Sequence, residues 1–431
     1  MSKIDLLKSK VVRNASWLIA GKIAQMIISL FVGLLTARYL GPSNYGLIGY
    51  AGAYVAFLTI FCNLGINSVL VKEFIDNPGQ EGKILGTTIG LRALSTLLSY
   101  ITLIVVVFLI DGNEPLTICV VALSSLGLFF RVFESFNYWF QSRLQSKVTA
   151  IASLIAYSIT AAYKIYLLID GASVVFFALV SSIEYVCLGI LLFYQYKKNS
   201  GSQFSFSWEY AKSLLGKSYH FILPSIMVAI YGQTDKLMMK QMISESEIGF
   251  YVAACTICAM WCFILSAIID SMYPPIMEAH GKDEEQYNRL NRQLYAIVFY
   301  VSVFVSAGIA LLAEPIVYIL YGSSYLPAVE PLRIITWYTA FSYLGVARNA
   351  WIVSENKQKY LFRIYVSAAV ANVALNLVLI PVWGASGAAV ASLVAQIVTT
   401  LIAPFFIKEL RQNSILMLQA IFLRGVFNPK K

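Results

Sequence analysis

Apolar runs of about 20 residues or more recur along the whole sequence, with only short polar connections between them. A run of this length is what an α-helix needs to cross the hydrocarbon core of a bilayer, which is roughly 30 Å thick. Inside a bilayer the backbone must satisfy its own hydrogen bonds, so such runs fold as helices. The sequence therefore predicts an all-α polytopic membrane protein with about 12 transmembrane helices. The runs lie at approximately 13–37, 43–66, 84–110, 115–140, 147–169, 172–196, 217–240, 246–276, 290–313, 328–353, 360–381 and 385–407.

The scarcity of charge excludes an ordinary soluble domain. Charged residues make up 13% of the 431 residues, about half of the roughly 25% that soluble domains carry. The mean hydropathy of +0.72 agrees. The first apolar run follows four basic residues, as a signal peptide would, but it is too long for one and offers no small-residue cleavage site. We therefore expect it to be a retained first span.

Lys and Arg are distributed unevenly between the two sides of this predicted topology. Of the 32 basic residues, 23 fall on the side that holds both termini, and only Arg38 and Lys240 fall on the other. The remaining seven lie within spans. An excess of positive charge marks the cytoplasmic side of a membrane protein. The pattern predicts that both termini are cytoplasmic, and it explains the net charge of +10 without nucleic acid.

A turn between the first two runs has a counterpart about 200 residues later. It reads ARYLGPSNYGLIG at 37–49, and its echo reads KQMISESEIGFYVAA at 240–254. Gly41 can cap the helix that begins at Pro42, while Ser244 and Glu247 have the spacing of a capping box. A glycine follows in both copies, at 46 and 249. The two copies indicate an internal duplication.

The duplication predicts two six-helix lobes related by a parallel repeat about an axis along the membrane normal, with a cavity at their interface. We expect an N-terminal lobe at 1–196, a cytoplasmic linker at 197–216 and a C-terminal lobe at 217–408. The basic amphipathic segment 409–431 is expected to lie on the inner leaflet. Gly86 and Gly90, four residues apart, predict close helix packing.

No catalytic, metal-binding or cofactor-binding motif is present, so the sequence predicts a transporter and not an enzyme. The two histidines lack a Ser or Cys partner at a motif spacing, and no phosphate-cradling glycine loop occurs. Cys255, Cys258 and Cys262 share one helix face, but without acidic or histidine neighbours they are interpreted as packing residues.

Ionisable residues inside the predicted spans are the candidate functional residues, since each costs several kcal/mol to insert. Cations outnumber anions seven to four, which suggests an aqueous cavity that attracts a phosphate. The alternative is that each charge pairs within its helix, as Arg131 and Glu134 could, or snorkels to an interface, as Arg92 and Arg348 could. The full set is Lys22, Arg92, Arg131, Lys164, Lys236, Arg333 and Arg348, with Glu134, Glu184, Asp235 and Asp270.

Four segments in order along the chain carry a resemblance: RYLGPSNYG, YGQTDKLMMKQMISESEIGFYVAA, YGSSYLPAVEPLRII and NVALNLVLIPVWGASGAAVAS. They resemble the polysaccharide-flippase branch of the multidrug/oligosaccharidyl-lipid/polysaccharide exporter superfamily, and in particular the Wzx-type O-antigen or capsule repeat-unit flippases. The similarity covers essentially the whole chain. Lipid II flippases of this superfamily carry an Asp-Arg pair where this chain has Ala253 and Ala254, and they have fourteen spans, so lipid II is not the expected substrate.

The resemblance implies a V-shaped fold of two six-helix lobes, like that of the multidrug exporters. It implies alternating access that moves undecaprenyl-diphosphate-linked oligosaccharide from the inner to the outer leaflet of the bacterial inner membrane, through a cationic lumen. It also implies a place beside the polymerase and chain-length proteins of lipopolysaccharide or capsule biosynthesis. A cation-coupled multidrug exporter of the same superfamily is the alternative. A membrane polymerase or ligase would need a larger outer loop than this chain has.

Residue by residue, the resemblance carries over to Lys22, Arg38, Asp235 and Lys236 as substrate-binding candidates. Arg131 and Lys164 join them by chemistry alone, and Glu134, Glu184 and Asp270 are candidates for ion coupling. Asn372 and Asn376 match the family pattern, but we expect them to form hydrogen bonds between helices. Lys22→Ala and Lys236→Ala are expected to abolish translocation in a protein that still inserts.

Overall fold

The computed structural model describes residues 3–199 and 203–426, and these contain helices and turns but no strand. The all-α fold class is confirmed. The chain divides into two compact units: residues 1–40 and 47–226 form the first, and residues 41–46 and 227–431 form the second. In the described residues, eight helices are long and apolar enough to cross a membrane, or nine if a pair bent by 41° counts as one span.

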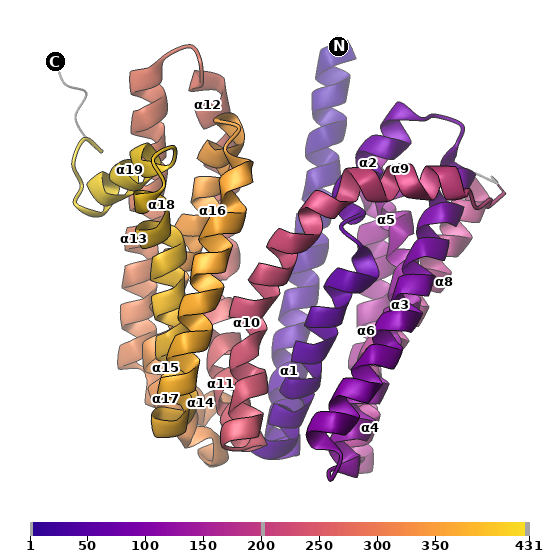
Figure 1. Cartoon of the computed structure of the whole chain (residues 1–431), viewed down its shortest axis with the longest axis vertical. Helices are drawn as coiled ribbons and strands as arrows, with labels where there is room; N and C mark the ends of the chain where they lie inside the picture. Colours follow the sequence, from indigo (N-terminus) through magenta and orange to yellow (C-terminus); the bar gives the residue numbers. More distant parts are fainter. Residues whose placement is uncertain (1–2, 200–202, 427–431) are drawn as a thin grey trace. The chain divides into compact units, whose positions relative to one another are not determined.

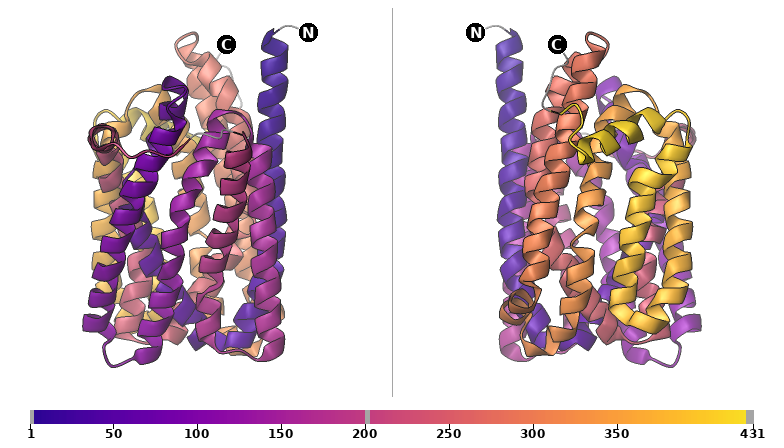
Figure 2. Two further views of the ribbon diagram at one scale, coloured as in Figure 1. Left: turned by 90° about the vertical axis from the view of Figure 1, so that its right-hand side faces the viewer. Right: turned by 90° about the vertical axis from the view of Figure 1, so that its left-hand side faces the viewer.

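The first unit is a bundle of long apolar helices that run alongside one another (Figure 1; Figure 2, left). Its core gathers Phe136, Trp139 and Tyr196, which have no access to solvent, with buried aliphatic side chains from neighbouring helices. Its elements are α1 (Lys3–Asn63), α2 (Asn67–Asp76), α3 (Glu81–Asp111), α4 (Pro115–Arg131), η1 (Val132–Glu134), α5 (Ser135–Ser142), α6 (Ser146–Asp170), α7 (Val174–Ala178), α8 (Val180–Asn199), α9 (Trp208–Ser218), η2 (Tyr219–Phe221) and the start of α10 (Ile222–Met242).

The second unit repeats this construction with its own core, built around Leu265, Leu294, Tyr295 and Trp351 (Figure 2, right). Its elements are the rest of α10, α11 (Glu245–Ala259), α12 (Cys262–Ala279), α13 (Glu284–Leu311), α14 (Ala313–Tyr321), η3 (Ser323–Ala328), α15 (Val329–Ile335), α16 (Tyr338–Ser354), η4 (Gln358–Tyr360), α17 (Leu361–Ile397), the π-helical η5 (Val398–Ile402), α18 (Ala403–Phe406) and α19 (Arg411–Ile421).

Two glycines divide the longest helices. Gly41 in α1 (φ 70°, ψ 172°) and Gly384 in α17 (φ 54°, ψ −130°) are non-helical, in a left-handed region that glycine enters without steric cost. They fall where the sequence predicted boundaries between consecutive spans. The nine spans of the described residues become twelve, the number of predicted runs, if α1 and α17 each count as two spans and α15 with α16 counts as one more.

The capping box predicted at Ser244 and Glu247 is wrong. Ser244 does precede α11 with an extended backbone, but its side chain makes no capping hydrogen bond. Glu247 Oε2 instead accepts a 2.6 Å hydrogen bond from the backbone N–H of Ala385, directly after the break at Gly384. The carboxylate thus satisfies a donor that the helix break leaves open, and it lies at a helix start, where negative charge is favourable.

The glycines shared by the two copies of the turn serve a close contact inside the second unit. A Cβ on Gly46 would lie 1.8 Å from the carbonyl oxygen of Glu245, and one on Gly249 would lie 2.1 Å from that of Pro42. No side chain fits at either position. The echo seen in the sequence therefore reflects two segments that pack backbone against backbone.

The segment after α18 folds back onto the second unit. In α19, Leu416, Met417 and Ala420 join the core beside α13 (Figure 1). The sequence led us to expect this segment on the inner leaflet. Ile415, Phe422 and Leu423 remain exposed, so part of the apolar surface of this segment is used for packing and the prediction of a place on the inner leaflet remains a prediction. The prediction for its last residues, 427–431, lies outside the described part.

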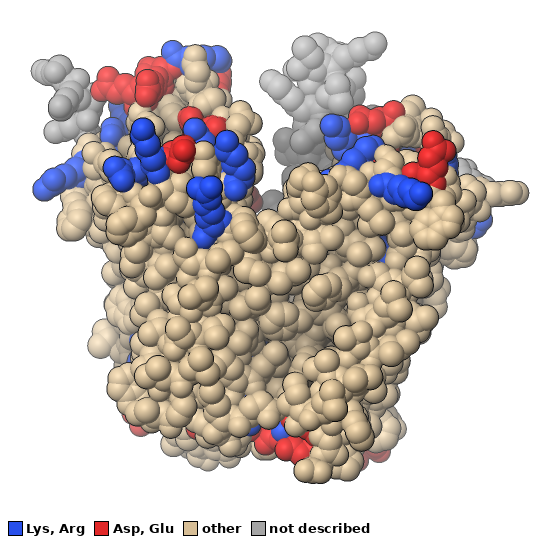
Figure 3. All heavy atoms as spheres, viewed as in Figure 1, with Lys and Arg blue, Asp and Glu red and all other residues tan. Residues whose placement is uncertain are grey.

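On the face seen in Figure 3, charged side chains are absent from the surface of the middle of the helices. Figure 3 shows that, in each unit taken by itself, most visible Lys and Arg side chains gather at one end of the helices, beside a wide band without charge. Such a band is what a segment immersed in hydrocarbon requires.

Candidate functional site

A polar cavity of about 670 Å³ lies within the first unit. It brings together Lys22 from α1, Arg131 from the end of α4 and Glu134 from η1, three residues that the sequence singled out. The close approach of α1 to α6 helps to place Lys22, since a Cβ on Gly21 would meet that of Ala150 at 3.2 Å. The lining residues are Gly21, Lys22, Gln25, Asn67, Arg131, Glu134, Asn137, Tyr138, Gln141, Ser146, Thr149, Ala150 and Ser153.

Arg131 and Glu134 form an ion pair, as their spacing predicted. Arg131 Nε lies 3.0 Å from Glu134 Oε2, with 27% and 20% of the two side chains exposed. The chain tightens to a 3₁₀ helix after Arg131, and side chains three residues apart eclipse one another in that conformation. Arg131 also donates a 2.9 Å hydrogen bond to Thr59 Oγ1 and lies 5.4 Å from the ring centre of Tyr185. Its guanidinium is therefore held in place.

Lys22 differs from Arg131 because it forms no hydrogen bond or ion pair with any residue that the structure describes. Its ammonium adds a positive charge to a cavity whose other cation is already paired with Glu134. The three side chains together carry one net positive charge. An anion that entered this cavity would meet an uncompensated donor.

Uncharged amides complete this cavity, and reasoning from charge alone missed them. Within the described chain, the Oδ1 atoms of Asn67 and Asn137 are buried without a hydrogen-bond partner. Such an atom forfeits about 1–3 kcal/mol until it finds a donor. Asn137 follows Glu134 by three residues, so helical spacing could have placed it on the same face. The two amide oxygens without a described partner, beside the Lys22 ammonium, suit a ligand that has hydroxyl groups and negative charge.

The other candidates of the first unit lie outside this lining. Lys164 on α6 and Glu184 on α8 interact electrostatically with each other. Glu184 also interacts electrostatically with Glu134 and Arg131. Arg38 is exposed just before the break in α1. In the second unit, Asp270 is exposed on α12. Neither of these two is among the residues that line the cavities described here.

Arg92 and Arg348 do not snorkel, as the alternative interpretation allowed, because both find acceptors inside the protein. Arg92 is 1% exposed and donates to Ser135 Oγ at 2.8 Å and to Asn63 Oδ1. Arg348 is 2% exposed and donates to the Thr399 carbonyl at 2.8 Å. That carbonyl belongs to the π-helix η5, whose altered ladder leaves carbonyls available to side chains. Both arginines therefore support the structure.

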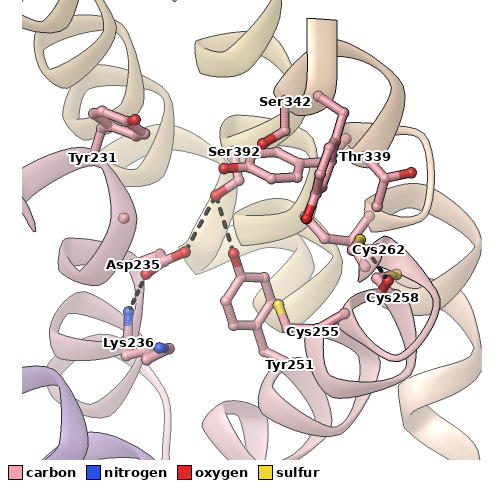
Figure 4. Close-up of a pocket in the computed structure, with 15 residues that line it drawn as sticks. Tyr231, Asp235, Lys236, Tyr251, Cys255, Cys258, Cys262, Thr339, Ser342 and Ser392 are labelled. Carbon is pink, nitrogen blue, oxygen red and sulfur yellow. Dashed lines mark hydrogen bonds between the residues drawn. The ribbon is translucent and has the colours of Figure 1, made fainter. Parts of the chain in front are cut away.

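A second cavity, of about 400 Å³, lies within the second unit and contains Asp235 and Lys236 (Figure 4). The Asp235 carboxylate is 1% exposed; it accepts a 3.2 Å hydrogen bond from Ser392 Oγ and a 2.9 Å bond from the Lys236 backbone N–H. Ser392 Oγ lies 3.0 Å from Tyr251 Oη. The Lys236 ammonium donates to Gln233 Oε1 at 2.8 Å. The polar groups here are bonded to one another.

Sulfur and aromatic groups line the rest of the second cavity (Figure 4). Cys255, Cys258 and Cys262 are free thiols on its wall, so they border a space as well as packing the helix. Among the described residues, no group of three or more His, Cys, Asp or Glu could hold a metal ion. The lining residues are Tyr231, Gly232, Asp235, Lys236, Tyr251, Cys255, Cys258, Ala259, Cys262, Ile335, Tyr338, Thr339, Ser342, Tyr343 and Ser392.

The predicted interhelical bonds of Asn372 and Asn376 are also wrong. Asn376 Nδ2 donates to Asn372 Oδ1 at 3.0 Å within the same helix, α17, and both side chains are fully buried. The reason is their spacing of four residues, which stacks them on one helix face.

Comparison with known proteins places these features in a family and a fold. The sequence profile of the Polysaccharide biosynthesis protein family matches residues 35–330. The probable low-salt glycan biosynthesis flippase Agl15 of Haloferax volcanii is 23% identical over 397 residues, which cover 88% of this chain and 80% of the relative.

Two solved structures share the fold. An inward-facing multidrug resistance MATE family transporter of the MOP superfamily superimposes with a TM-score of 0.70 at 14% identity, over 91% of this chain and 95% of the other. The lipid II flippase MurJ, in an inward closed conformation, gives a TM-score of 0.67 at 15% identity, over 96% and 94%. At such identities the likeness shows the fold alone.

Proposed function

Because this chain belongs to the Polysaccharide biosynthesis protein family, we propose that it is a flippase for lipid-linked oligosaccharides. Its proposed substrate is an undecaprenyl-diphosphate-linked repeat unit for O-antigen or capsule, as the resemblance to Wzx-type proteins implies. The protein would expose its binding site alternately to the two sides of the membrane and would make or break no substrate bond. A relative named as a probable glycan biosynthesis flippase supports the proposal.

The observation that carries the proposal is the polar cavity of the first unit. Lys22 and Arg131 supply positive charge there, and Asn67 and Asn137 supply buried acceptors without a described partner. Ammonium and guanidinium groups suit a diphosphate, and amides suit sugar hydroxyls. We assign the diphosphate to the two cations and the first sugars to the amides.

Asp235 and Lys236 of the second cavity are retained as substrate-binding candidates of lower rank, because their polar atoms already bond within the protein. Lys164 and Arg38 would guide the anion from outside the cavity. Glu134, Glu184 and Asp270 remain proposals for ion coupling.

We also propose that the protein lies in a bacterial inner membrane with both termini in the cytoplasm. The support is the uneven distribution of Lys and Arg, which favours that side. Polymerase and chain-length proteins of the same pathway are its proposed partners, since they would consume the translocated repeat unit. Reporter fusions at the two termini test the orientation.

The test is deletion of the protein followed by structural analysis of the lipid-linked glycan that accumulates. We expect an undecaprenyl-diphosphate oligosaccharide to build up on the cytoplasmic side and surface polysaccharide to disappear, with recovery on complementation. If no glycan accumulates and sensitivity to drugs rises, the protein is a multidrug exporter. If the accumulated glycan is on another carrier, the flippase proposal stands and the assignment of undecaprenyl diphosphate falls.

A further inference from the structure

A second kind of cavity in the first unit is almost entirely apolar. It measures about 670 Å³ and lies between α3 and α8, with the segment 203–207 along one side. Its lining is hydrocarbon and aromatic apart from one lysine: Gly86, Ile89, Gly90, Phe133, Phe136, Gly189, Ile190, Phe193, Lys197, Phe204 and Phe206. We call it the α3–α8 groove.

The glycines Gly86 and Gly90 admit the non-helical segment 203–207 close to α3. Ser205 N–H donates to the Gly82 carbonyl at 3.3 Å, and Ser207 N–H donates to Thr87 Oγ1 at 3.2 Å. A Cβ on Gly86 would lie 2.5 Å from the Ser205 carbonyl oxygen, and one on Gly90 would lie 2.9 Å from the Phe206 ring. The close helix packing predicted from these glycines is therefore wrong, because the non-helical segment 203–207 occupies the place of the expected helix.

The groove opens toward the surface that would face lipid. Ile190 on its wall is 63% exposed, and Phe193 and Phe206 are 40% and 49% exposed. Exposed apolar patches of this kind mark surfaces that contact a membrane or a partner, and hydrocarbon suits them on a spanning segment. The groove is therefore within reach of a lipid chain from the bilayer.

Lys197 places one positive charge at the rim. Its Nζ lies 5.1 Å from the ring centre of Phe204 and 5.9 Å from that of Phe193, while the side chain remains exposed. The charge is thus held next to the apolar lining and still faces water. An apolar groove with a cation at its mouth is complementary to a hydrocarbon chain that ends in an anionic headgroup.

The groove is separate from the polar cavity. Phe133 and Phe136 face the groove, while Glu134 and Asn137 of the same η1–α5 segment face the polar cavity. A ligand held by its charged head among the residues around Lys22 would have to pass this wall to reach the groove. The groove therefore suits a lipid other than the one that the polar cavity would bind.

We propose that the α3–α8 groove binds an acyl chain of an anionic membrane phospholipid, with the phosphate of the headgroup against Lys197. The bound lipid fills the space between α3, α8 and the segment 203–207 and stabilises their packing. This site does not depend on glycan translocation.

The test is native mass spectrometry of the full-length protein in micelles that contain equal amounts of phosphatidylglycerol and phosphatidylcholine. Wild type is expected to retain one phosphatidylglycerol about five-fold more than phosphatidylcholine, the effect of one lysine near an anionic headgroup. Lys197→Glu should remove that preference. Lys198→Glu is the matched control, since Lys198 is exposed on the same helix but does not line the groove, and it should behave as wild type.

A second variant tests the groove itself. Ile190→Trp adds bulk at an exposed wall position and should reduce retention of both lipids, with unchanged monodispersity on size-exclusion chromatography. Equal effects of Lys197→Glu and Lys198→Glu would overturn the proposal, because the attraction would then be a general surface effect. Retention of a polyprenyl lipid in place of phospholipid, or of no lipid, would also overturn it.

Discussion

The polar cavity of the first unit and the cavity of the second unit both contain residues predicted from buried charge, yet their polar atoms are in opposite situations. In the first, Lys22 has no partner among the described residues and two amide oxygens are idle. In the second, Asp235 is bonded to Ser392 and Lys236 to Gln233. A site kept ready for a ligand leaves groups without partners, and the two buried amide oxygens do so at a cost in stability. By this criterion the first cavity is the better candidate for substrate binding.

The largest expected effect is on Lys22. Lys22→Glu should abolish translocation, because it removes a charge-assisted hydrogen bond worth about 10- to 100-fold in affinity and adds repulsion of the diphosphate. Lys22→Arg keeps the charge and should retain most activity. The measurement is surface polysaccharide in a deletion strain complemented with each variant. Equal activity of the Glu and Arg variants would mean that Lys22 does not contact an anion.

Removal of Arg131 should affect both activity and stability. Arg131→Ala leaves Glu134 without its partner, and the partial exposure of the pair limits the expected loss of unfolding free energy to about 2 kcal/mol. Adding Glu134→Gln should restore the melting temperature in detergent but not translocation. If the double variant regains translocation, the pair is structural and the cavity does not need its guanidinium.

Lys236→Ala sharpens the comparison between the cavities. The sequence led us to expect loss of translocation equal to that of Lys22→Ala. Since the Lys236 ammonium is already bonded to Gln233 within α10, we now expect a partial loss, several-fold smaller than for Lys22→Ala in the same assay. A loss as complete as that of Lys22→Ala would mean that the second cavity is as important for substrate binding as the first.

The smallest expected effect is at Ser392. Ser392→Ala removes one hydrogen bond from Asp235, and about 1 kcal/mol of unfolding free energy should be lost. Thermal unfolding in detergent should show a shift of a few degrees or less, with translocation close to that of wild type. Abolished translocation in a stable Ser392→Ala variant would show that the Asp235 network acts in transport.

The sequence was sufficient for the fold class and for the pairing of Arg131 with Glu134, since both depend on local spacing. Apolar length specifies spanning helices, and an interval of three residues specifies a neighbour on one face. The sequence was not sufficient to identify the hydrogen-bond partner of Glu247, because that partner, Ala385, lies 138 residues away. Nor did it locate the acceptors of Arg92 and Arg348, which belong to other helices.

The polar amides of the first cavity show a different limit of prediction from the sequence. Asn67 and Asn137 carry no charge, so a search for buried charge passes over them, although their unsatisfied oxygens are the clearest sign of an open site. The same applies to the α3–α8 groove, whose glycines predicted a helix contact. Only the path of the segment 203–207 shows what those glycines admit.

The contact of Arg348 with the Thr399 carbonyl has a consequence for the biogenesis of this protein. An arginine within an inserting helix costs up to about 3 kcal/mol at the translocon, and among the described residues the main-chain acceptors of Arg348 lie on η5, 51 and 52 residues later. The segment 338–354 is therefore expected to be less stable in the membrane until the ribosome has delivered α17 and η5. Nascent chains that end before residue 398 should leave it accessible to a water-phase reporter, whereas chains that include residues 398–402 should protect it.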